Sequence, residues 1–280
     1  MEDRITSVSN PRIKNLVELR KKAKLREKTG RFVIEGTRLF MDTPDDSIAE
    51  AYVTDRWLRN ASGQEREKLQ GHPFARVTEE VMAKAADTAT PQGILCAAKM
   101  PSWTREDLLG IRPAEISVSG RQPLLLVLED IQDPGNLGTM FRTAEAAGAT
   151  GILMSRGTVD LFNPKVVRAT MSAVFRMPFC VSEDLCADIA ALQEAGIGVY
   201  AAHLDGRRAY DSLPLAKGSA FLIGNEGNGL SDRVGEAADE KIIIPMAGGA
   251  ESLNAAMAAG ILLFEAARQR RGGRAFLQDF

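Results

Sequence analysis

The sequence predicts an α/β protein with two parts, the second of which holds a mainly parallel sheet. Short apolar or β-branched runs alternate with stretches of helical spacing through most of the 280 residues. The run LLLVLE at residues 124–129 shows no polar alternation, which is typical of a strand covered on both faces. A stretch with Pro, Gly and Ser separates the two parts. We therefore expect domains at residues 1–100 and 123–280, joined by a linker at residues 101–122.

The elements of the first domain follow from short runs between Gly, Pro and polar clusters. We predict strands at residues 31–35, 50–54, 75–77 and 92–98, and helices at residues 37–41, 55–58 and 79–86. Before them, the stretch from Arg12 to Arg38 holds ten basic and three acidic residues. Apolar residues at helical spacing predict a basic helix here that ends at Gly30. Such a helix suits a phosphate backbone, and a solvated surface helix explains it equally well.

The second domain repeats the strand and helix pattern. We predict strands at residues 124–129, 151–154, 179–181, 199–203, 220–223 and 241–245, and helices at residues 138–147, 165–173 and 185–195. A long apolar helix follows the last strand and runs to Arg271. Ligands of parallel sheets bind at the carboxyl ends of strands. The loops after Glu129, Ile223 and Pro245 are therefore the candidate site.

Composition narrows the class of protein. The formal charge of -2 gives no sign of nucleic-acid binding by the chain as a whole, so a basic surface has to be local. The first residues contain no apolar signal segment, and the last helix is too short to span a bilayer, so we expect a cytoplasmic protein. The cysteines are odd in number and form no CxxC pair, which argues against a disulfide framework and a metal site.

Each of the three loops carries polar groups suited to a ligand. In DIQDPGNLGTMFR, Asn136 offers a donor and an acceptor and Arg142 a permanent cation. In LIGNEGNGLS, Glu226 lies among three glycines whose spacing matches neither a dinucleotide fingerprint nor a P-loop. In KIIIPMAGGAESLN, Ser252 and Asn254 lie beside a helix start. Simple capping by Asn136 or Ser252 explains part of this pattern as well.

Together the three loops resemble the motifs of the SpoU branch of the SPOUT superfamily, the TrmH-like RNA ribose 2′-O-methyltransferases. The matching stretches are DPGNLGTMFRTA from Asp133, IGNEGNGLS from Ile223 and IPMAGGAESLN from Ile244. The resemblance covers roughly residues 120 to 271. The stretch from Arg4 to Met41 also looks like the ribosomal-protein-L30e-like substrate-binding domain that precedes the catalytic domain in many members. One departure is Ser172, where many relatives have glycine.

The resemblance implies S-adenosylmethionine as the methyl donor, a trefoil knot formed by the last two loops, and a homodimer that packs through the knotted domain. Carried over position by position, it implies a cofactor pocket lined by Gly224, Ile244, Met246 and Leu253. It also implies a catalytic set around the ribose, formed by Asn136, Arg142, Glu226, Ser252 and Asn254. The candidate RNA contacts of the first domain are Arg12, Lys14, Lys21, Lys22 and Arg38.

The implied reaction requires a proton to leave the 2′-hydroxyl as its oxygen attacks the sulfonium methyl. Arg142 is the residue that the family assigns to this activation, and orienting the hydroxyl and stabilising its developing charge suits a guanidinium best. A 2′-hydroxyl makes the substrate RNA. Ribosomal RNA is the leading expectation and transfer RNA the alternative. A non-catalytic RNA-binding protein of the same fold and another nucleotide-dependent α/β enzyme are the other readings.

Overall fold

The computed structural model describes residues 4–110 and 122–271. It divides into two compact units, which we describe separately. Unit 1 comprises Met1–Pro101 and Asp160–Phe175, and unit 2 comprises Ser102–Val159 and Arg176–Phe280. Residues 160–175, which belong by sequence to the second predicted domain, thus pack with the first unit.

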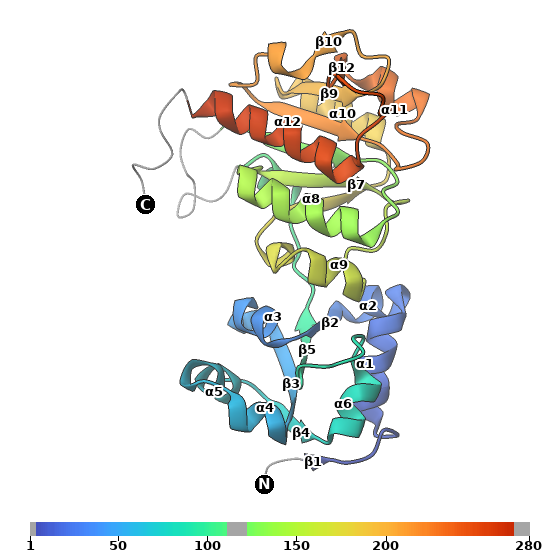
Figure 1. Cartoon of the computed structure of the whole chain (residues 1–280). Helices are drawn as coiled ribbons and strands as arrows, with labels where there is room; N and C mark the ends of the chain where they lie inside the picture. The colour runs from blue at the N-terminus through green and yellow to red at the C-terminus, as the bar shows by residue number, and fades with distance from the viewer. Residues whose placement is uncertain (1–3, 111–121, 272–280) are drawn as a thin grey trace. The chain divides into compact units, whose positions relative to one another are not determined.

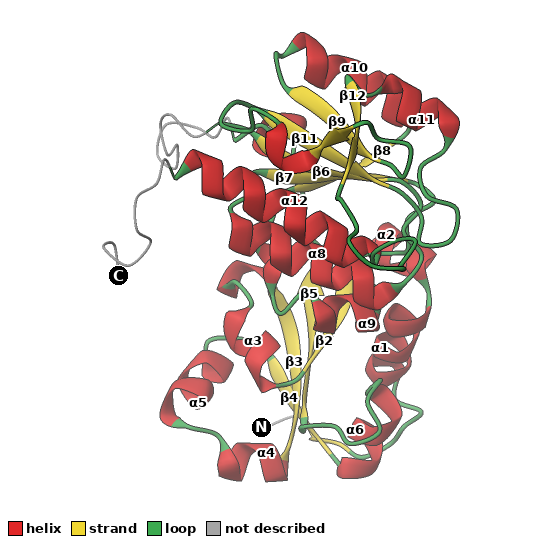
Figure 2. Ribbon diagram, turned by 45° about the horizontal axis from the view of Figure 1, so that its top comes forward, coloured by secondary structure: helices red, strands yellow, loops and turns green. Residues whose placement is uncertain are grey.

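Unit 1 is a five-stranded sheet with helices on both faces. Its strands are β1 (Arg4–Ile5), β2 (Arg31–Glu35), β3 (Ile48–Thr54), β4 (Phe74–Val77) and β5 (Ile94–Lys99), in the order β1-β4-β3-β5-β2. Its helices are α1 (Pro11–Lys21), α2 (Ala23–Thr29), α3 (Thr37–Asp42), α4 (Asp55–Asn60), α5 (Gly63–Gln70), α6 (Glu79–Ala85) and α9 (Pro164–Ala169), with 3₁₀ turns η1 (Asp45–Ser47) and η2 (Ala173–Phe175). Strand β5 runs antiparallel to β2 and β3. Helices α1 and α6 lie on one side of the sheet and α3, α4 and α5 on the other (Figures 1 and 2).

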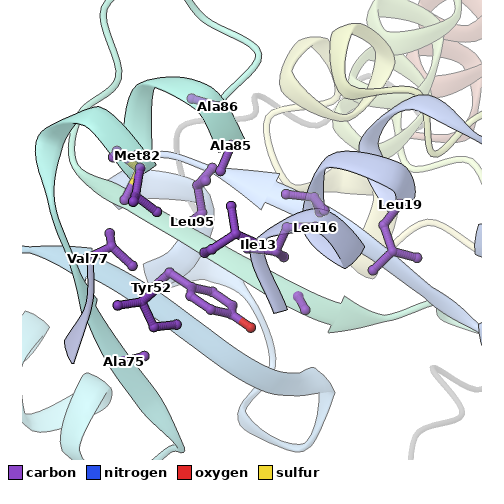
Figure 3. Packing of buried hydrophobic residues seen from close by; sticks show 14 residues of the cluster. Ile13, Leu16, Leu19, Tyr52, Ala75, Val77, Met82, Ala85, Ala86 and Leu95 are labelled. Atoms are coloured by element: carbon purple, nitrogen blue, oxygen red, sulfur yellow. The ribbon is translucent and has the colours of Figure 1, made fainter. Parts of the chain in front are cut away.

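The core of unit 1 forms where the apolar face of α1 meets the sheet. Figure 3 shows Ile13 and Leu16 of α1 beside Met82 of α6 and Leu95 of β5. Ile13 and Leu16 recur at helical spacing and are 1% exposed, so the amphipathic pattern has placed them in the core. Burial of such side chains stabilises the fold by about 1.5–3 kcal/mol each.

The predicted basic helix is two helices that meet at Lys22. Arg26 of α2 is buried, at 4% exposed, and its guanidinium donates to the carbonyl oxygens of Leu19 (2.5 Å) and Arg20 (3.0 Å) in the last turn of α1. The same side chain pairs with Asp160. Arg26, one of the ten basic residues from Arg12 to Arg38, is therefore not free for a phosphate backbone, because its charge is used to end α1 and to hold residue 160.

Unit 2 contains the expected parallel sheet. Its strands are β6 (Leu124–Leu128), β7 (Gly151–Ser155), β8 (Phe179–Ser182), β9 (Gly198–Ala202), β10 (Arg208–Ala209), β11 (Ser219–Ile223) and β12 (Glu240–Ile243), in the order β10-β12-β9-β11-β6-β7-β8. Its helices are α7 (Arg105–Leu108), α8 (Pro134–Ala147), α10 (Leu185–Glu194), α11 (Asp232–Ala237) and α12 (Ala255–Arg270), with the 3₁₀ turn η3 (Tyr210–Ser212). All pairings within this sheet are parallel, and every residue of β6 and β11 is buried. The continuous apolar runs thus predicted their position correctly.

The helices of unit 2 lie on both faces of this sheet. Helices α8 and α12 cover one face side by side, and α10 and α11 cover the other (Figure 2). Gly260 of α12 faces Thr143 of α8, where an added Cβ would lie 3.4 Å from the threonine methyl. A small residue at this position lets the two helices approach closely.

Some element boundaries differ from those expected. Helix α8 begins at Pro134, four residues before the predicted start, because the side chain of Asp133 accepts from the backbone N–H of Asn136 and caps the helix (2.8 Å). Helix α9 ends at Ala169, earlier than predicted, because Met171 and Ser172 have φ of 48° and 72°. The expected linker contains α7, and its residues 111–121 lie outside the described residues.

The structure around Ser172 explains why many relatives have glycine at this position. Its positive φ is the conformation that glycine adopts without strain, and a side chain there costs about 1–2 kcal/mol. The buried hydroxyl donates to Asp42 Oδ2 at 2.8 Å, within unit 1. This hydrogen bond offsets part of the strain.

Candidate active site

Two of the three candidate loops start side by side because their strands are neighbours. Strand β11 pairs with β6 in parallel, with Ile223 opposite Leu128. The chains leave the sheet at its carboxyl edge, and Glu129 donates its backbone N–H to the carbonyl of Ile223 (2.9 Å). The carboxylate of Glu129 then accepts from the backbone N–H (2.7 Å) and the hydroxyl (2.6 Å) of Ser231. Both loops are thereby held at their bases.

Glu226 joins the second loop to the first. Its carboxylate accepts hydrogen bonds from the backbone N–H groups of Gln132 and Asp133 and from Asn136 Nδ2, each at 3.0 Å. The two backbone groups lie immediately before α8, where a helix start leaves donors to satisfy. A carboxylate placed there also interacts favourably with the helix dipole. Glu226 therefore fixes the entrance of α8 and, with it, the side chain of Asn136.

Asn254 brings the third loop to the same point. Its Oδ1 accepts from the backbone N–H groups of Ala256 (3.0 Å) and Met257 (3.1 Å), so it caps α12. Its Nδ2 donates to Asn136 Oδ1 at 2.9 Å. The hydrogen bonds run in one direction, from the start of α12 through both amides to the carboxylate of Glu226, and such chains polarise one another.

The direction of this chain fixes what the amides can offer a ligand. The oxygens of Asn136 and Asn254 already accept, and each Nδ2 has used one of its two hydrogens. The remaining hydrogens suit acceptor oxygens, such as those of a ribose. The simple alternative, in which Asn136 or Ser252 caps a helix, was wrong, since Asp133 and Asn254 are the N-caps.

The ionisation of Glu226 follows from its partners. Partial burial raises the pKa of this carboxyl, but the hydrogen bonds from Asn136 and from backbone N–H groups outweigh it, and the pKa lies below the ordinary value of 4.5. Glu226 is thus ionised at neutral pH and is a weak proton acceptor. Its three hydrogen bonds join the first two loops.

The second loop approaches itself closely at Gly224. A Cβ at this position would lie 2.1 Å from the backbone of Gly229 and Leu230. Asn225 and Gly229 exchange two backbone hydrogen bonds, of 3.0 and 2.9 Å, which hold the turn at this separation. Only glycine fits here, which gives a physical reason for the residue in the IGNEGNGLS motif.

The third loop presents unused backbone donors. Among the described residues, no backbone N–H from Met246 to Leu253 donates a hydrogen bond to the protein. Met246 is 36% exposed, and added Cβ atoms at Gly248 and Gly249 would meet nothing within 4 Å. A loop with an apolar side chain and unpaired amides fits a ligand that combines a flat apolar ring with polar atoms, as adenosine does.

The structure does not join all predicted site residues. Asn136, Glu226 and Asn254 are linked directly. The side chains of Arg142 and Ser252 are exposed and make no hydrogen bond or ion pair with any described residue. Of the cofactor candidates, Gly224 is buried, and Ile244 and Leu253 are half-buried. Their roles stay predictions.

The candidate RNA contacts of unit 1 also differ in how free they are. Arg12 pairs with Glu50 and lies 5.5 Å from the ring centre of Tyr52. Lys22 pairs with Glu18 at 2.8 Å, and Arg38 lies 3.9 Å from Asp42. Lys14 and Lys21 are exposed and make no ion pair within the described part of the chain. They occur seven residues apart on α1 and therefore share one face.

Sequence reasoning missed three contributors. The backbone N–H groups of Gln132 and Asp133 bind Glu226, and Asp130 adopts a φ of 53° while its carbonyl accepts from Asn225 Nδ2 (2.8 Å). Asp130 directly follows the strand predicted at residues 124–129, and Asp is one of the few residues that tolerate this conformation. The position of Asp130 could therefore have been predicted from the sequence. The role of the backbone N–H groups of Gln132 and Asp133 could not, because a backbone donor does not depend on the type of side chain.

Across residues 4–110 and 122–271, three or more His, Cys, Asp or Glu side chains do not gather as metal ligands would. Over the same ranges, no helix combines the length and apolar character needed to cross a bilayer.

Unit 2 is a parallel sheet with three polar loops, two of which leave its carboxyl edge side by side, and a smaller α/β unit precedes it in the chain. This combination is that of an α/β enzyme with a separate substrate-binding domain. The model of the SpoU rRNA methylase family matches residues 123–264, and that of the MRM3-like substrate-binding domain matches residues 10–96. The chain therefore belongs to the SpoU rRNA methylase family, and the resemblance read from its motifs is confirmed.

Curated relatives cover nearly the whole chain. The 23S rRNA (guanosine(2553)-2′-O)-methyltransferase RlmP of Bacillus subtilis (strain 168) is 33% identical over 262 residues, which are 93% of this chain and 97% of the relative. The mitochondrial rRNA methyltransferase 3 of Homo sapiens is 30% identical over 312 residues, 93% of this chain and 73% of the relative.

Solved structures agree with this assignment. The AdoMet-bound rRNA methyltransferase from Sinorhizobium meliloti is 32% identical with a TM-score of 0.79, covering 95% of this chain and 98% of that one. The SpoU methyltransferase AviRb from Streptomyces viridochromogenes, in complex with AdoMet, is 26% identical with a TM-score of 0.82, covering 95% and 100%. The predicted fold class is confirmed.

Proposed function

We propose that this protein is an S-adenosylmethionine-dependent RNA methyltransferase that modifies a ribose 2′-hydroxyl in ribosomal RNA. The observation that carries the proposal is the hydrogen-bonded chain Glu226–Asn136–Asn254, which unites the three family motifs at one edge of the sheet. The names of its relatives support ribosomal RNA over the transfer-RNA alternative. Residues 1–100 act as the RNA-binding domain and residues 123–280 as the catalytic domain.

The residues of the site divide into two jobs. Gly224, Ile244, Met246 and Leu253 hold the cofactor, mostly through backbone groups of the third loop. When bound, S-adenosylmethionine supplies an electrophilic methyl group on a sulfonium. Asn136 and Asn254 donate their remaining N–H groups to ribose oxygens, and Ser252 adds a hydroxyl beside them. Glu226 positions the first two loops.

Arg142 activates the ribose in this proposal. The 2′-oxygen attacks the methyl carbon, the bond from that carbon to sulfur breaks, and the hydroxyl proton passes to water. A guanidinium beside the 2′-oxygen would stabilise the negative charge that develops on it. The side chain is exposed and unpaired within the described residues, so it is available to a substrate. Glu226 is not the proton acceptor, because its lowered pKa and three donors make it a weak base.

A homodimer through the knotted domain is part of the proposal. The trefoil knot implied by the family motifs lies in the same region. Met257 and Phe264, seven residues apart on α12, are 59% and 44% exposed, while the opposite face of this helix packs on α8 and β11. A partner subunit would cover these apolar side chains. Light scattering should give twice the chain mass of 30.3 kDa, and a monomer would contradict this part.

Methyl transfer tests the proposed activity. Purified protein with tritium-labelled S-adenosylmethionine should label unmodified 23S ribosomal RNA, and nuclease digestion should release the label as a 2′-O-methylnucleoside. Transfer RNA serves as the alternative substrate and the Arg142→Ala variant as the control. Label in a methylated base, or in no RNA, would refute the proposal. The cytoplasmic location expected from the sequence stays a prediction.

A further inference from the structure

Unit 1 contains a cavity of about 390 Å³ on the side of its sheet covered by α3, α4 and α5. The cavity is lined by residues from four places in unit 1: Thr37 at the start of α3, Arg56, Trp57, Asn60 and Ala61 at α4 and its end, Glu65 of α5, and Gln92 before β5. This volume lies within the roughly 300–1,000 Å³ of small-ligand sites. The mechanism proposed above makes no use of this cavity.

Two polar side chains of the cavity are held in fixed orientations. Gln92 Oε1 accepts from the backbone N–H of Thr37 at 2.9 Å, which leaves Nε2 as a donor. Thr37 Oγ1 accepts from Trp57 Nε1 at 2.9 Å, which leaves its own hydrogen to donate. Neither remaining donor has a partner among the described residues. Gly36, at φ 104°, permits this arrangement, since a Cβ there would lie 3.1 Å from Gln92 Oε1.

The rest of the lining suits a neutral planar ligand. The side chain of Asn60 is exposed and makes no hydrogen bond with the described part of the chain, so its amide adds a donor and an acceptor. Trp57 and Ala61 contribute apolar atoms to the lining, and most of each side chain is buried, at 5% and 8% exposed. One cation, Arg56, and one anion, Glu65, line the cavity, and this balance disfavours a phosphate.

We propose that this cavity binds one unstacked nucleobase of the RNA substrate, preferentially a base with carbonyl oxygens. Proteins read RNA mostly at single-stranded loops, where unstacked bases are hydrogen-bonded on their edges. The fixed donors of Thr37 and Gln92 match carbonyl acceptors, and the amide of Asn60 can pair with a ring N–H. The inference rests on RNA being the substrate, and it places a base-specific contact on the face of the sheet opposite to α1.

Filling the cavity tests the proposal in the full chain. We would measure the Kd of a 23S ribosomal RNA transcript between about 0.05 and 0.2 M salt for the wild type, Asn60→Trp, Asn60→Ala and Gln64→Trp. Gln64 is exposed on α5 and does not line the cavity, so it controls for an added tryptophan. Asn60→Trp should weaken binding about tenfold or more at the higher salt, Asn60→Ala less, and Gln64→Trp less than twofold. Melting curves check folding, and Asn60→Ala keeps the test valid if the larger side chain disturbs it.

The salt dependence separates a base contact from a phosphate contact. Loss of a base contact leaves the slope of log Kd against log salt unchanged, whereas loss of a phosphate contact lowers it by about one. Equal Kd values for Asn60→Trp and Gln64→Trp, or a lowered slope, would overturn the proposal. Tritium transfer on the same preparations tells the two proposals apart. If the wild type transfers methyl groups and Asn60→Trp binds RNA with an unchanged Kd, only the proposal for the cavity is refuted. If the wild type transfers no methyl groups and Asn60→Trp binds RNA more weakly, only the proposed methyltransferase activity is refuted.

Discussion

Replacing Gly224 by alanine should disable the proposed cofactor site. The new Cβ would lie 2.1 Å from Gly229 and Leu230, and since ordinary contact begins at 3.4 Å, the backbone has to move by about 1.3 Å. The two backbone hydrogen bonds between Asn225 and Gly229 oppose this movement. Losing both costs about 1–3 kcal/mol. When this free energy is lost only from the cofactor-bound conformation of the loop, S-adenosylmethionine binds roughly 5- to 150-fold more weakly.

The matched control for this variant is Gly227→Ala in the same loop. There the nearest atom to a new Cβ is Asn225 Oδ1 at 3.5 Å, an ordinary contact, and φ is not in the left-handed region. Titration calorimetry with S-adenosylmethionine should show weak binding for Gly224→Ala and nearly wild-type binding for Gly227→Ala. Equal affinities for the two variants, with both folded, would refute the reasoning from close approach.

Three further predictions concern catalysis, strain and pH. Arg142→Ala should lower kcat by about 10²–10³-fold with little change in cofactor affinity, and calorimetry that finds the affinity lost would contradict the assignment. Ser172→Ala and Ser172→Gly both lose the hydrogen bond to Asp42, but only glycine relieves the strain of the positive φ. Denaturant unfolding should therefore find the Ser172→Ala variant about 1 kcal/mol less stable than the Ser172→Gly variant. Because the pKa of Glu226 is lowered in the folded protein, its stabilisation is present above pH 4.5 and is lost as pH falls through the folded pKa. The melting temperatures of the wild type and Glu226→Gln should therefore differ at pH 7 and converge in acid, and a constant difference would contradict this.

The sheet of unit 2 was predictable from residue patterns. LLLVL in β6 is apolar throughout, and β11 is apolar after its first residue, Ser219, so burial on both faces follows from their composition. Helix boundaries were less predictable, because they depend on which side chain caps. Asp133 and Asn254 are the N-caps of α8 and α12, although Asn136 and Ser252 are residue types that cap helices equally well.

The sequence predicted which residues form the candidate site better than it predicted the hydrogen bonds between them. The motifs named Asn136, Glu226 and Asn254, but their hydrogen-bonded order depends on three loops meeting at one sheet edge. The buried role of Arg26 could not be read from a run of cations, since its partners Leu19, Arg20 and Asp160 include two backbone carbonyls and a residue 134 positions away. Long-range pairing of this kind leaves no local pattern.

Mapping of 2′-O-methyl groups in ribosomal RNA tests the central claim most directly. A 2′-O-methyl group protects the adjacent phosphodiester from alkaline cleavage, so each site appears as a gap in a cleavage profile. RNA from cells with the gene should show one or more protected positions that are absent from cells without it. The positions should return with the wild-type gene and fail to return with Arg142→Ala. Identical profiles in the two cell lines would contradict ribosomal RNA as the substrate.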